Sequence, residues 1–218
     1  MSLSERVRRA VADPDQPSSL GARLRARRWD LLLGRHPDLA EMRVLDLGGT
    51  GQAWRAAPVK PAQLVVLNQE AGELGELTGA ELVVGDVCEL PASLQGERFD
   101  LVYSNSVIEH VGGHAKRLAM ADVVHRMGDH HWIQTPYRYF PIEPHWLFPG
   151  MQFLPAALRV RVARRWRLSW ARPKSWEGVD NVLWIQLLSR TEMRHYFPES
   201  ELVDEKIMFV TKSLIAAR

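Results

Sequence analysis

The sequence has little that would tie it to a membrane, to nucleic acid or to an oxidising compartment. It contains one cysteine, Cys88, among 218 residues. No disulfide can form within the chain, and we expect a reducing, cytoplasmic environment. No apolar run is long enough to cross a bilayer, and residues 1–6 have no apolar signal core. The net charge of +2 gives no argument for a nucleic-acid partner.

Two common nucleotide-binding signatures are also missing. The glycine-rich stretch around Gly48, Gly49 and Gly51 lacks the Gly-Lys-Ser/Thr ending of a phosphate loop. Its spacing also differs from the Gly-x-Gly-x-x-Gly of dinucleotide folds. What the chain does have is 46% hydrophobic and 25% charged residues. This balance fits one globular domain with a full core.

The stretch from Arg43 to Gly51 organises the rest of the chain. It predicts a short buried strand containing Asp46, then a glycine turn, then a helix opening near Gln52. Glycines allow a ligand to approach the main chain closely, and the N–H groups of the helix suit an anionic group. An acidic side chain before the turn would suit a ligand with a positive amino group. We therefore expect a ligand site at the end of the first strand of an α/β sheet.

This stretch resembles motif I of class I S-adenosylmethionine-dependent methyltransferases, commonly Asp/Glu-x-Gly-x-Gly-x-Gly. Thr50 and Gln52 stand where the second and third glycines of that motif are expected. The resemblance implies S-adenosylmethionine as the cofactor. It also implies cofactor-binding roles for four residues of the motif, namely Asp46, Gly48, Gly49 and Gly51.

The next two predicted strands continue the resemblance. The strand over 63–68 ends at Asn68, followed by Gln69, where the family has an acidic residue that holds the ribose hydroxyls. An Asn amide can also accept from and donate to a hydroxyl, although it can equally start a turn. The strand over 81–86 ends in Asp86, followed by Val87. The resemblance implies that the Asp86 carboxylate and the Val87 N–H bind adenine; a simple turn or cap is the alternative.

The predicted fourth strand, over 99–104, begins the closest match to the family. Its Phe-Asp-x-Val start and the later Glu-His-Val are both present, and strand, loop and helix start coincide. In the family this loop lies beside the methionine part of the cofactor. The resemblance therefore implies a backbone contact from Asn105 and places Glu109 and His110 near the reacting centre.

Strands and helices alternate along most of the chain. We expect helices over 4–9, 19–33, 115–127 and 189–196, a fifth strand over 130–134, and two last strands over 202–209 and 212–217. This pattern predicts a doubly wound α/β fold, and the resemblance implies a seven-stranded Rossmann-like sheet with a C-terminal antiparallel hairpin. We expect one methyltransferase domain over 1–218: helices in 1–42, a cofactor-binding core in 43–137, an insertion in 138–189, and a helix and hairpin in 190–218.

The insertion breaks the alternation, and we interpret it as a helical, aromatic lid over the substrate. Its arginines could bind an acidic or phosphorylated substrate, could lie on a membrane or a lipid-linked substrate, or could form a solvated helix face. No recognisable nucleic-acid module accompanies them, so RNA or DNA is disfavoured. The basic residues between 154 and 174, with no acid among them, are Arg159, Arg161, Arg164, Arg165, Arg167, Arg172 and Lys174.

Methyl transfer to a hydroxyl or an ammonium also needs a proton acceptor, for which histidine is the natural choice near neutral pH. His110 and His145 are the candidate catalytic bases, with Glu143 placed to orient His145. Each histidine could equally have a packing role. We expect no metal site, because His130 and His131 are adjacent on a strand and point to opposite faces.

The sequence therefore predicts S-adenosylmethionine-dependent methyl transfer to an oxygen or nitrogen of a small molecule. The chain is similar to the group that includes O-methyltransferases of quinone biosynthesis and natural-product tailoring enzymes. We expect its acceptor to belong to natural-product or cell-envelope biosynthesis. One alternative is an NAD(P)-dependent reductase, against which Asp46 and Asp86 count. The other is a non-catalytic Rossmann-like protein that binds a partner through the basic, Trp-rich insertion. The altered glycine turn and Asn68 leave this second alternative open.

Overall fold

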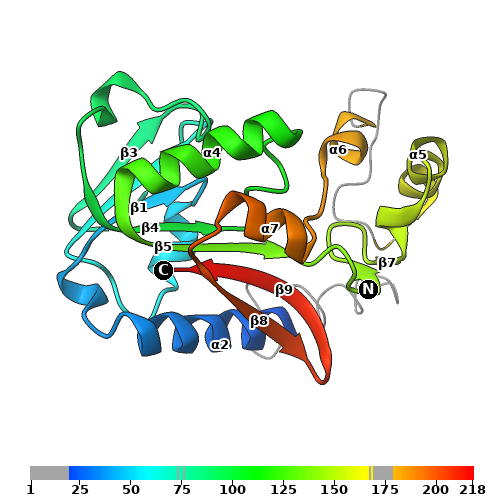
Figure 1. The fold of residues 1–218 in the computed structure, drawn as a ribbon, viewed down its shortest axis with the longest axis horizontal. Coiled ribbons are helices and arrows are strands. Elements are labelled where there is room, and N and C mark those ends of the chain that lie inside the picture. Colours follow the sequence, from blue (N-terminus) through cyan, green and yellow to red (C-terminus); the bar gives the residue numbers. More distant parts are fainter. Residues whose placement is uncertain (1–19, 73, 76, 167, 169–178) are drawn as a thin grey trace. The chain divides into compact units, whose positions relative to one another are not determined.

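The computed structural model describes the chain except for residues 1–19, 73, 76, 167 and 169–178, and it divides into two compact units (Figure 1). The core unit comprises residues 36–137 and 186–218, and the insertion unit comprises residues 1–35 and 138–185. The predicted helix over 4–9 lies outside the described residues. That all of these residues form one methyltransferase domain stays a prediction.

The core unit is built on a seven-stranded sheet with the order β3-β2-β1-β4-β5-β9-β8. The strands from β3 to β5 in this order pair in parallel, while β9 pairs antiparallel with both β5 and β8. The predicted Rossmann-like sheet with a C-terminal hairpin is therefore confirmed. The strands are β1 Arg43–Leu47, β2 Gln63–Asn68, β3 Ala80–Val84, β4 Phe99–Asn105, β5 Gly128–Pro136, β8 Glu201–Ile207 and β9 Val210–Ala217.

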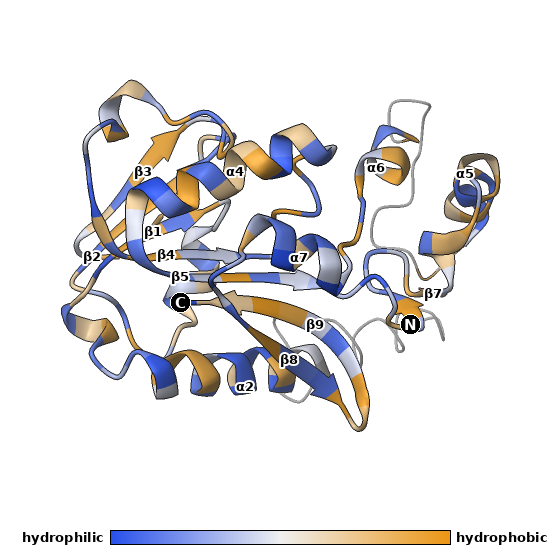
Figure 2. Cartoon of the chain, viewed as in Figure 1, coloured by the Kyte–Doolittle hydropathy of each residue, from blue (hydrophilic) through white to orange (hydrophobic). Residues whose placement is uncertain are grey.

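The central strands form because their side chains are apolar on both faces, which is typical of a parallel sheet covered on both sides. Val44, Leu45 and Leu47 of β1 are fully buried. Helices α4 (His114–Met127) and α7 (Arg190–Tyr196) lie over one face, where their apolar residues join the main core (Figure 1). Hydrophobic and hydrophilic residues alternate along α4, as expected for a helix with one buried side (Figure 2).

Short helices complete the core unit, and their ends are set by local side chains. Helix α3 (Gly51–Arg55) follows the glycine turn, and its N-cap Thr50 accepts a hydrogen bond from the Ala53 N–H. Ser189 and Glu192 form a capping box at the start of α7, which ties up backbone N–H groups that the helix leaves unpaired. The other short helices of the core unit are the 3-10 helices η1 Leu39–Glu41 and η2 Ala92–Leu94.

The insertion unit has the helical and aromatic character that the sequence predicts. Trp146, Met151, Ala163 and Val182 form a small core of its own, with further apolar residues packed around it. No helix in the described parts of either unit is both long and apolar enough to span a bilayer. The elements of the insertion unit are α2 Leu20–Arg35, β6 Ile142–Glu143, β7 Phe148–Pro149, η3 Met151–Phe153, α5 Ala156–Arg165 and α6 Val179–Trp184.

Replacing Leu45 with Ala tests how much the fold depends on the centre of the sheet. Leu45 is fully buried in β1, between β2 and β4. We expect Leu45→Ala to lower the free energy of unfolding by about 2–5 kcal/mol, because it leaves a cavity in a close-packed core. Urea denaturation followed by circular dichroism measures the change. The matched control is Val84→Ala in edge strand β3, where the side chain is 55% exposed and we expect a much smaller loss. Equal losses in the two variants would contradict this description of the core.

Candidate active site

Hydrogen bonds join the carboxyl ends of β1, β2, β3 and β4 and the turns that follow β1 and β3. The Gly48 N–H donates to the Leu67 carbonyl at 2.7 Å, and the Gly85 N–H donates to the Asn68 carbonyl at 2.9 Å. The Ser104 hydroxyl donates to the Leu47 carbonyl at 3.0 Å. The strand order reverses at β1 and β4, and ligands of open α/β sheets bind at such a switch point. We therefore take the end of β1 as the candidate site, and a ligand there stays a prediction.

The turn after β1 requires glycine at two consecutive positions. Gly48 has a φ of +78°, and a Cβ there would lie 2.6 Å from Val107 Cγ2. A Cβ on Gly49 would lie only 1.6 Å from Asp46 Oδ2, so a side chain there would displace this carboxylate. Gly51, also predicted for the site, is buried at the start of α3. These close contacts explain why the turn keeps its glycines although Thr50 and Gln52 depart from the motif.

Asp46 is the most unusual polar group of the site. Its side chain is almost fully buried, and its Oδ2 accepts a hydrogen bond from the Trp54 indole N–H at 2.6 Å. Its Oδ1 has no hydrogen-bond partner among the described residues. Burial, opposed by the Trp54 hydrogen bond, raises the pKa of Asp46 to about 7. Trp54 could not be predicted as the partner of Asp46, because a Trp eight residues after an Asp belongs to no motif.

Asn68 holds the neighbouring loops rather than pointing away from them. Its amide nitrogen donates to the Gly49 carbonyl at 2.8 Å, and its amide oxygen accepts from the Glu70 N–H at 3.1 Å. These contacts match the turn role that was the alternative interpretation of Asn68. Gln69 follows it as an exposed residue. Roles for Asn68 and Gln69 in binding ribose stay predictions.

Asp86 lies in the turn after β3 with both carboxylate oxygens engaged. One oxygen accepts from the Cys88 N–H at 2.8 Å, and the other pairs with the Lys116 ammonium at 3.0 Å. Burial opposes ionisation, but the Cys88 N–H and Lys116 outweigh it and lower the pKa of Asp86. The next residue, Val87, packs its side chain into the main core. Lys116 is a site neighbour that sequence reasoning missed.

The loop after β4 is held in a strained conformation. Ser106, directly after Asn105, has a φ of +58°, a region that side chains other than glycine rarely adopt. Its N–H and hydroxyl donate to the Gln134 carbonyl at 3.0 Å and to the Gln134 side-chain oxygen at 2.9 Å. Strain of this kind persists only where surrounding contacts enforce it and is common at functional sites.

Glu109 and His110 follow in the same loop. Glu109 is fully buried, and its carboxylate accepts from the Thr135 hydroxyl at 2.9 Å. The His110 ring is about two-fifths exposed, with Nε2 3.9 Å from Glu109 Oε1. A partly exposed imidazole beside a buried carboxylate can take up and release a proton. The core unit thus brings His110 to the same end of the sheet as Asp46 and Asn105.

The second predicted base lies in the insertion unit, where it forms a pair with Glu143. A hydrogen bond of 2.6 Å joins His145 Nδ1 and Glu143 Oε1, while Glu143 Oε2 accepts from the Trp146 N–H at 2.8 Å. Because an ionised carboxylate only accepts, Nδ1 carries the proton and Nε2 of a neutral ring is left as the basic nitrogen. Because Glu143 is buried, its hydrogen bond fixes the orientation of the His145 ring.

His130 and His131 on β5 lie in different environments. His130 is exposed and its ring contacts that of His36, whereas His131 is buried and bonded to the Ser200 hydroxyl at 2.6 Å. Burial, with a smaller effect of nearby His125, lowers the pKa of His131 to about 3. His131 is therefore neutral. The expected lack of a metal site stays a prediction.

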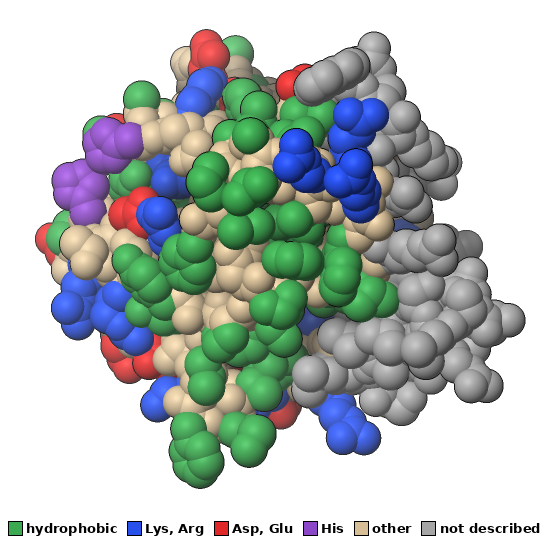
Figure 3. All heavy atoms as spheres, turned by 90° about the vertical axis from the view of Figure 1, so that its right-hand side faces the viewer, with side chains coloured by type: hydrophobic (Ala, Val, Ile, Leu, Met, Phe, Trp, Pro, Cys, Tyr) green, Lys and Arg blue, Asp and Glu red, His purple; other side chains and the backbone are tan. Residues whose placement is uncertain are grey.

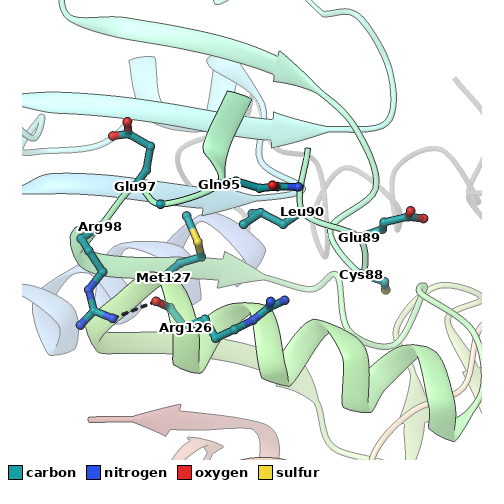
Figure 4. A pocket seen from close by; sticks show the side chains of 9 residues that line it. Cys88, Glu89, Leu90, Gln95, Glu97, Arg98, Arg126 and Met127 are labelled. Atoms are coloured by element: carbon teal, nitrogen blue, oxygen red, sulfur yellow. Dashed lines mark hydrogen bonds between the residues drawn. The ribbon is translucent and has the colours of Figure 1, made fainter. Parts of the chain in front are cut away.

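An open cavity of about 570 Å³ lies in the core unit beside the C-terminal end of α4 (Figure 4). None of the predicted site residues is among the residues that line it. Its acidic and basic residues include Glu97 and Arg98, which already pair with Arg43 and Asp129. Burial, and next the Asp86 carboxylate, raise the pKa of the Cys88 thiol in its wall to about 12, so this thiol is unreactive. The lining residues are Cys88, Glu89, Leu90, Gln95, Gly96, Glu97, Arg98, Arg126 and Met127.

Comparisons with known proteins agree with this geometry. Residues 45–130 match a family model described as a methyltransferase domain. The fold is similar to magnesium protoporphyrin IX methyltransferase (ChlM) from Synechocystis PCC 6803 with bound S-adenosylhomocysteine (SAH), at 11% identity and a TM-score of 0.52, covering 99% of this chain and 93% of that one. No curated protein sequence matches the chain.

Two further solved structures share the fold. The DhpI–SAH complex has 11% identity and a TM-score of 0.55, and the match covers 98% of this chain and 93% of that one. The N-terminal domain of EvdMO1 with SAH bound has 17% identity and a TM-score of 0.53, covering 100% and 95%. Strand order, the glycine turn beside Asp46 and the family match over residues 45–130 lead to one conclusion. Residues 45–130 form a methyltransferase domain, and the sheet that contains them has the fold of these S-adenosylhomocysteine-bound structures.

Proposed function

We propose that this S-adenosylmethionine-dependent methyltransferase acts on an oxygen or nitrogen nucleophile of a small-molecule acceptor. The observation that supports S-adenosylmethionine as the methyl donor is the buried carboxyl of Asp46. One of its oxygens has no partner among the described residues, and it adjoins a turn with no room for a Cβ at Gly49. A buried acceptor of this kind is costly unless a ligand satisfies it, and the cationic amino group of S-adenosylmethionine fits it.

The remaining cofactor contacts are proposed from the loops that adjoin this turn. Asp46, Gly48, Gly49 and Gly51 would hold the amino-acid part of the cofactor. Asn105 would add a backbone contact to the methionine part. Asn68 and Gln69 would hold the ribose, and Asp86 and Val87 the adenine. Hydrogen bonds from Gly48, Gly85 and Asn68 support the proposal, because they tie the turns after β1 and β3 to the end of β2 before a ligand enters.

Bound S-adenosylmethionine supplies a methyl group already activated by a positive sulfur. The protein must align the acceptor, keep water out and take up the proton of a hydroxyl or ammonium nucleophile. His110 and His145 are the proposed proton acceptors, one in each unit. We favour His145, because its buried partner Glu143 fixes Nδ1 as a donor and leaves Nε2 to act as the base.

The nature of the acceptor is proposed from the insertion unit. Its arginines favour an acidic or lipid-linked small molecule, of the kind found in natural-product or cell-envelope biosynthesis. The name of ChlM, which shares the fold, assigns it magnesium protoporphyrin IX. We also propose a cytoplasmic location, which the single free thiol of Cys88 supports.

Calorimetric titration tests the proposed function. We expect S-adenosylmethionine and S-adenosylhomocysteine to bind with affinities in about the micromolar range and NADH not to bind. A screen of acidic and lipid-linked acceptors, read out as release of S-adenosylhomocysteine, then identifies the substrate. Binding of NADH alone would revive the reductase alternative. Binding of none of the three would favour the non-catalytic alternative.

Asp86→Ala tests the proposed adenine site. We expect the affinity for S-adenosylhomocysteine to fall at least about tenfold, because a hydrogen bond to an ionised group is worth about 1.5–3 kcal/mol. Calorimetry measures the affinity. The matched control is Asp129→Ala, which also removes an aspartate paired with an exposed cation in the core unit. Unchanged affinity in a folded Asp86→Ala protein would remove Asp86 from the site.

Asp46→Asn separates the stability of the ligand-free protein from its function. The pKa of Asp46 is raised from 3.8 to about 7, so the folded state binds more protons than the unfolded state between these values. As pH rises from about 4 to about 7, Asp46 ionises in the unfolded chain but stays protonated in the folded protein. The free energy of unfolding therefore falls over this range by about 4 kcal/mol. Asn cannot ionise, yet its oxygen can still accept from Trp54.

We therefore expect Asp46→Asn to gain stability relative to the native protein as pH rises through this range, while it binds S-adenosylmethionine more weakly. Urea denaturation of both ligand-free proteins at several pH values measures the first effect, and calorimetry measures the second. Parallel stability curves across the whole range would show that Asp46 does not titrate as described.

Three variants identify the base once an acceptor is known. We expect His145→Ala to lower turnover by about 10²–10⁴-fold with the affinity for S-adenosylhomocysteine unchanged, because only proton transfer is lost. Glu143→Gln should lower turnover too, since it removes the carboxylate that fixes the ring. If His110→Ala gives the large loss and Glu143→Gln does not, His110 is the base. Normal turnover in all three variants would show that neither histidine accepts the proton.

A further inference from the structure

Helix α5 of the insertion unit concentrates positive charge. Residues 153–166 contain four arginines and neither Asp nor Glu. Three of the four arginine side chains, Arg161, Arg164 and Arg165, are exposed. No acid in this segment offsets them, so the helix presents an excess of positive charge to whatever it meets.

The two sides of α5 differ in what they contact. On the inner side, Ala163 is fully buried in the small core, and the Arg159 guanidinium donates to the Val182 carbonyl of α6 at 3.3 Å. On the other side, Leu158, Arg161 and Arg165 follow one another at helical spacing and are exposed. This outer side therefore mixes an apolar side chain with arginines.

Exposed aromatic and aliphatic side chains lie on α5 and next to it. Phe153, just before α5, is 53% exposed, and Leu158 is 43% exposed. The ring of Tyr139 stacks on Phe153 with centroids 5.9 Å apart, although Tyr139 is itself 57% exposed. On the face drawn in Figure 3, hydrophobic side chains gather beside a group of arginine and lysine side chains. Neighbouring exposed apolar side chains mark an interaction surface more often than single ones do.

We propose that this surface, made of Tyr139, Phe153, Leu158, Arg161 and Arg165, docks on an anionic lipid membrane. A helix that lies in the membrane interface needs apolar side chains that enter the acyl boundary and cations that meet the phosphate groups. The surface supplies both, and arginine is the cation best suited to phosphate oxygens. The proposal does not rest on methyl transfer, because the docking surface contains none of the proposed catalytic or cofactor-binding residues.

Vesicle sedimentation of the full chain tests the proposal. We expect binding to vesicles of phosphatidylglycerol mixed with phosphatidylcholine, little binding to phosphatidylcholine alone, and a loss of binding at high salt. Arg161→Gln with Arg165→Gln should weaken binding about tenfold or more, because each cation near an anionic surface contributes about 1 kcal/mol. Arg161→Lys with Arg165→Lys, which keeps both charges, should retain most of the binding.

Two further variants serve as controls. Arg23→Gln with Arg27→Gln removes two exposed arginines at the same spacing from α2, and we expect it to bind vesicles like the native protein. Met208→Ser with Phe209→Ser removes two side chains of the β8–β9 turn that are 84% and 91% exposed, and we expect no loss there either. An equal loss in either control would show that binding follows general charge or general exposed apolar surface, and would overturn the assignment to α5.

Two other outcomes would also overturn the proposal. One is equal sedimentation with neutral and anionic vesicles. The other has two parts. The protein does not sediment with anionic vesicles, yet it binds a duplex oligonucleotide or an acidic polypeptide, and Arg161→Gln with Arg165→Gln weakens that binding. Circular dichroism of each variant confirms that a loss of binding does not come from unfolding. Calorimetry with S-adenosylhomocysteine, run on the same samples, keeps failure of membrane docking distinct from failure of the cofactor site.

Discussion

The site depends on one buried carboxyl group. Asp46 sits in the middle of a parallel sheet, where an ionised side chain is expensive, and it receives one hydrogen bond from Trp54. The position of this carboxyl leaves no room for a side chain on Gly49, and the close approach of Val107 leaves none on Gly48. Asp46 and Val107 therefore determine which residues the turn can hold. Burial raises the pKa of Asp46 to about 7, so the ligand-free protein keeps an unfavourable group at the position proposed for the cofactor.

Much of the fold could be predicted because the strands are continuous apolar runs with clear ends. The strand predicted over 63–68 has those same bounds in the structure, and the strand predicted over 99–104 extends by one residue. The acidic residue before a glycine turn also indicated a candidate site, because its place in the chain and its chemistry both pointed to the end of the first strand. The end of edge strand β3 was harder to predict, since Gly85 and Asp86 were expected inside the strand and lie just beyond it.

Contacts between distant segments could not be predicted. Thr135 meets Glu109, and Lys116 meets Asp86, because loops and a helix from separate parts of the chain fold onto one end of the sheet. Sequence spacing carries no information about such pairs without the geometry of the sheet. The left-handed conformation of Ser106 was equally hidden, since it is enforced by Gln134 on the next strand and not by any local preference for a turn.

The position of β9 has a consequence for the order in which the protein is made. Strand β9 (Val210–Ala217) lies between β5 and β8, so it separates two strands that both precede it in the chain. While the chain is emerging from the ribosome, the edge of β5 has no neighbour until residues 210–217 have been synthesised. Until then the nascent protein exposes the backbone of a strand rich in buried residues, which is the kind of edge that recruits other chains. This sheet is therefore completed only after all its other strands have been made, and the edge of β5 stays open until β9 pairs with it.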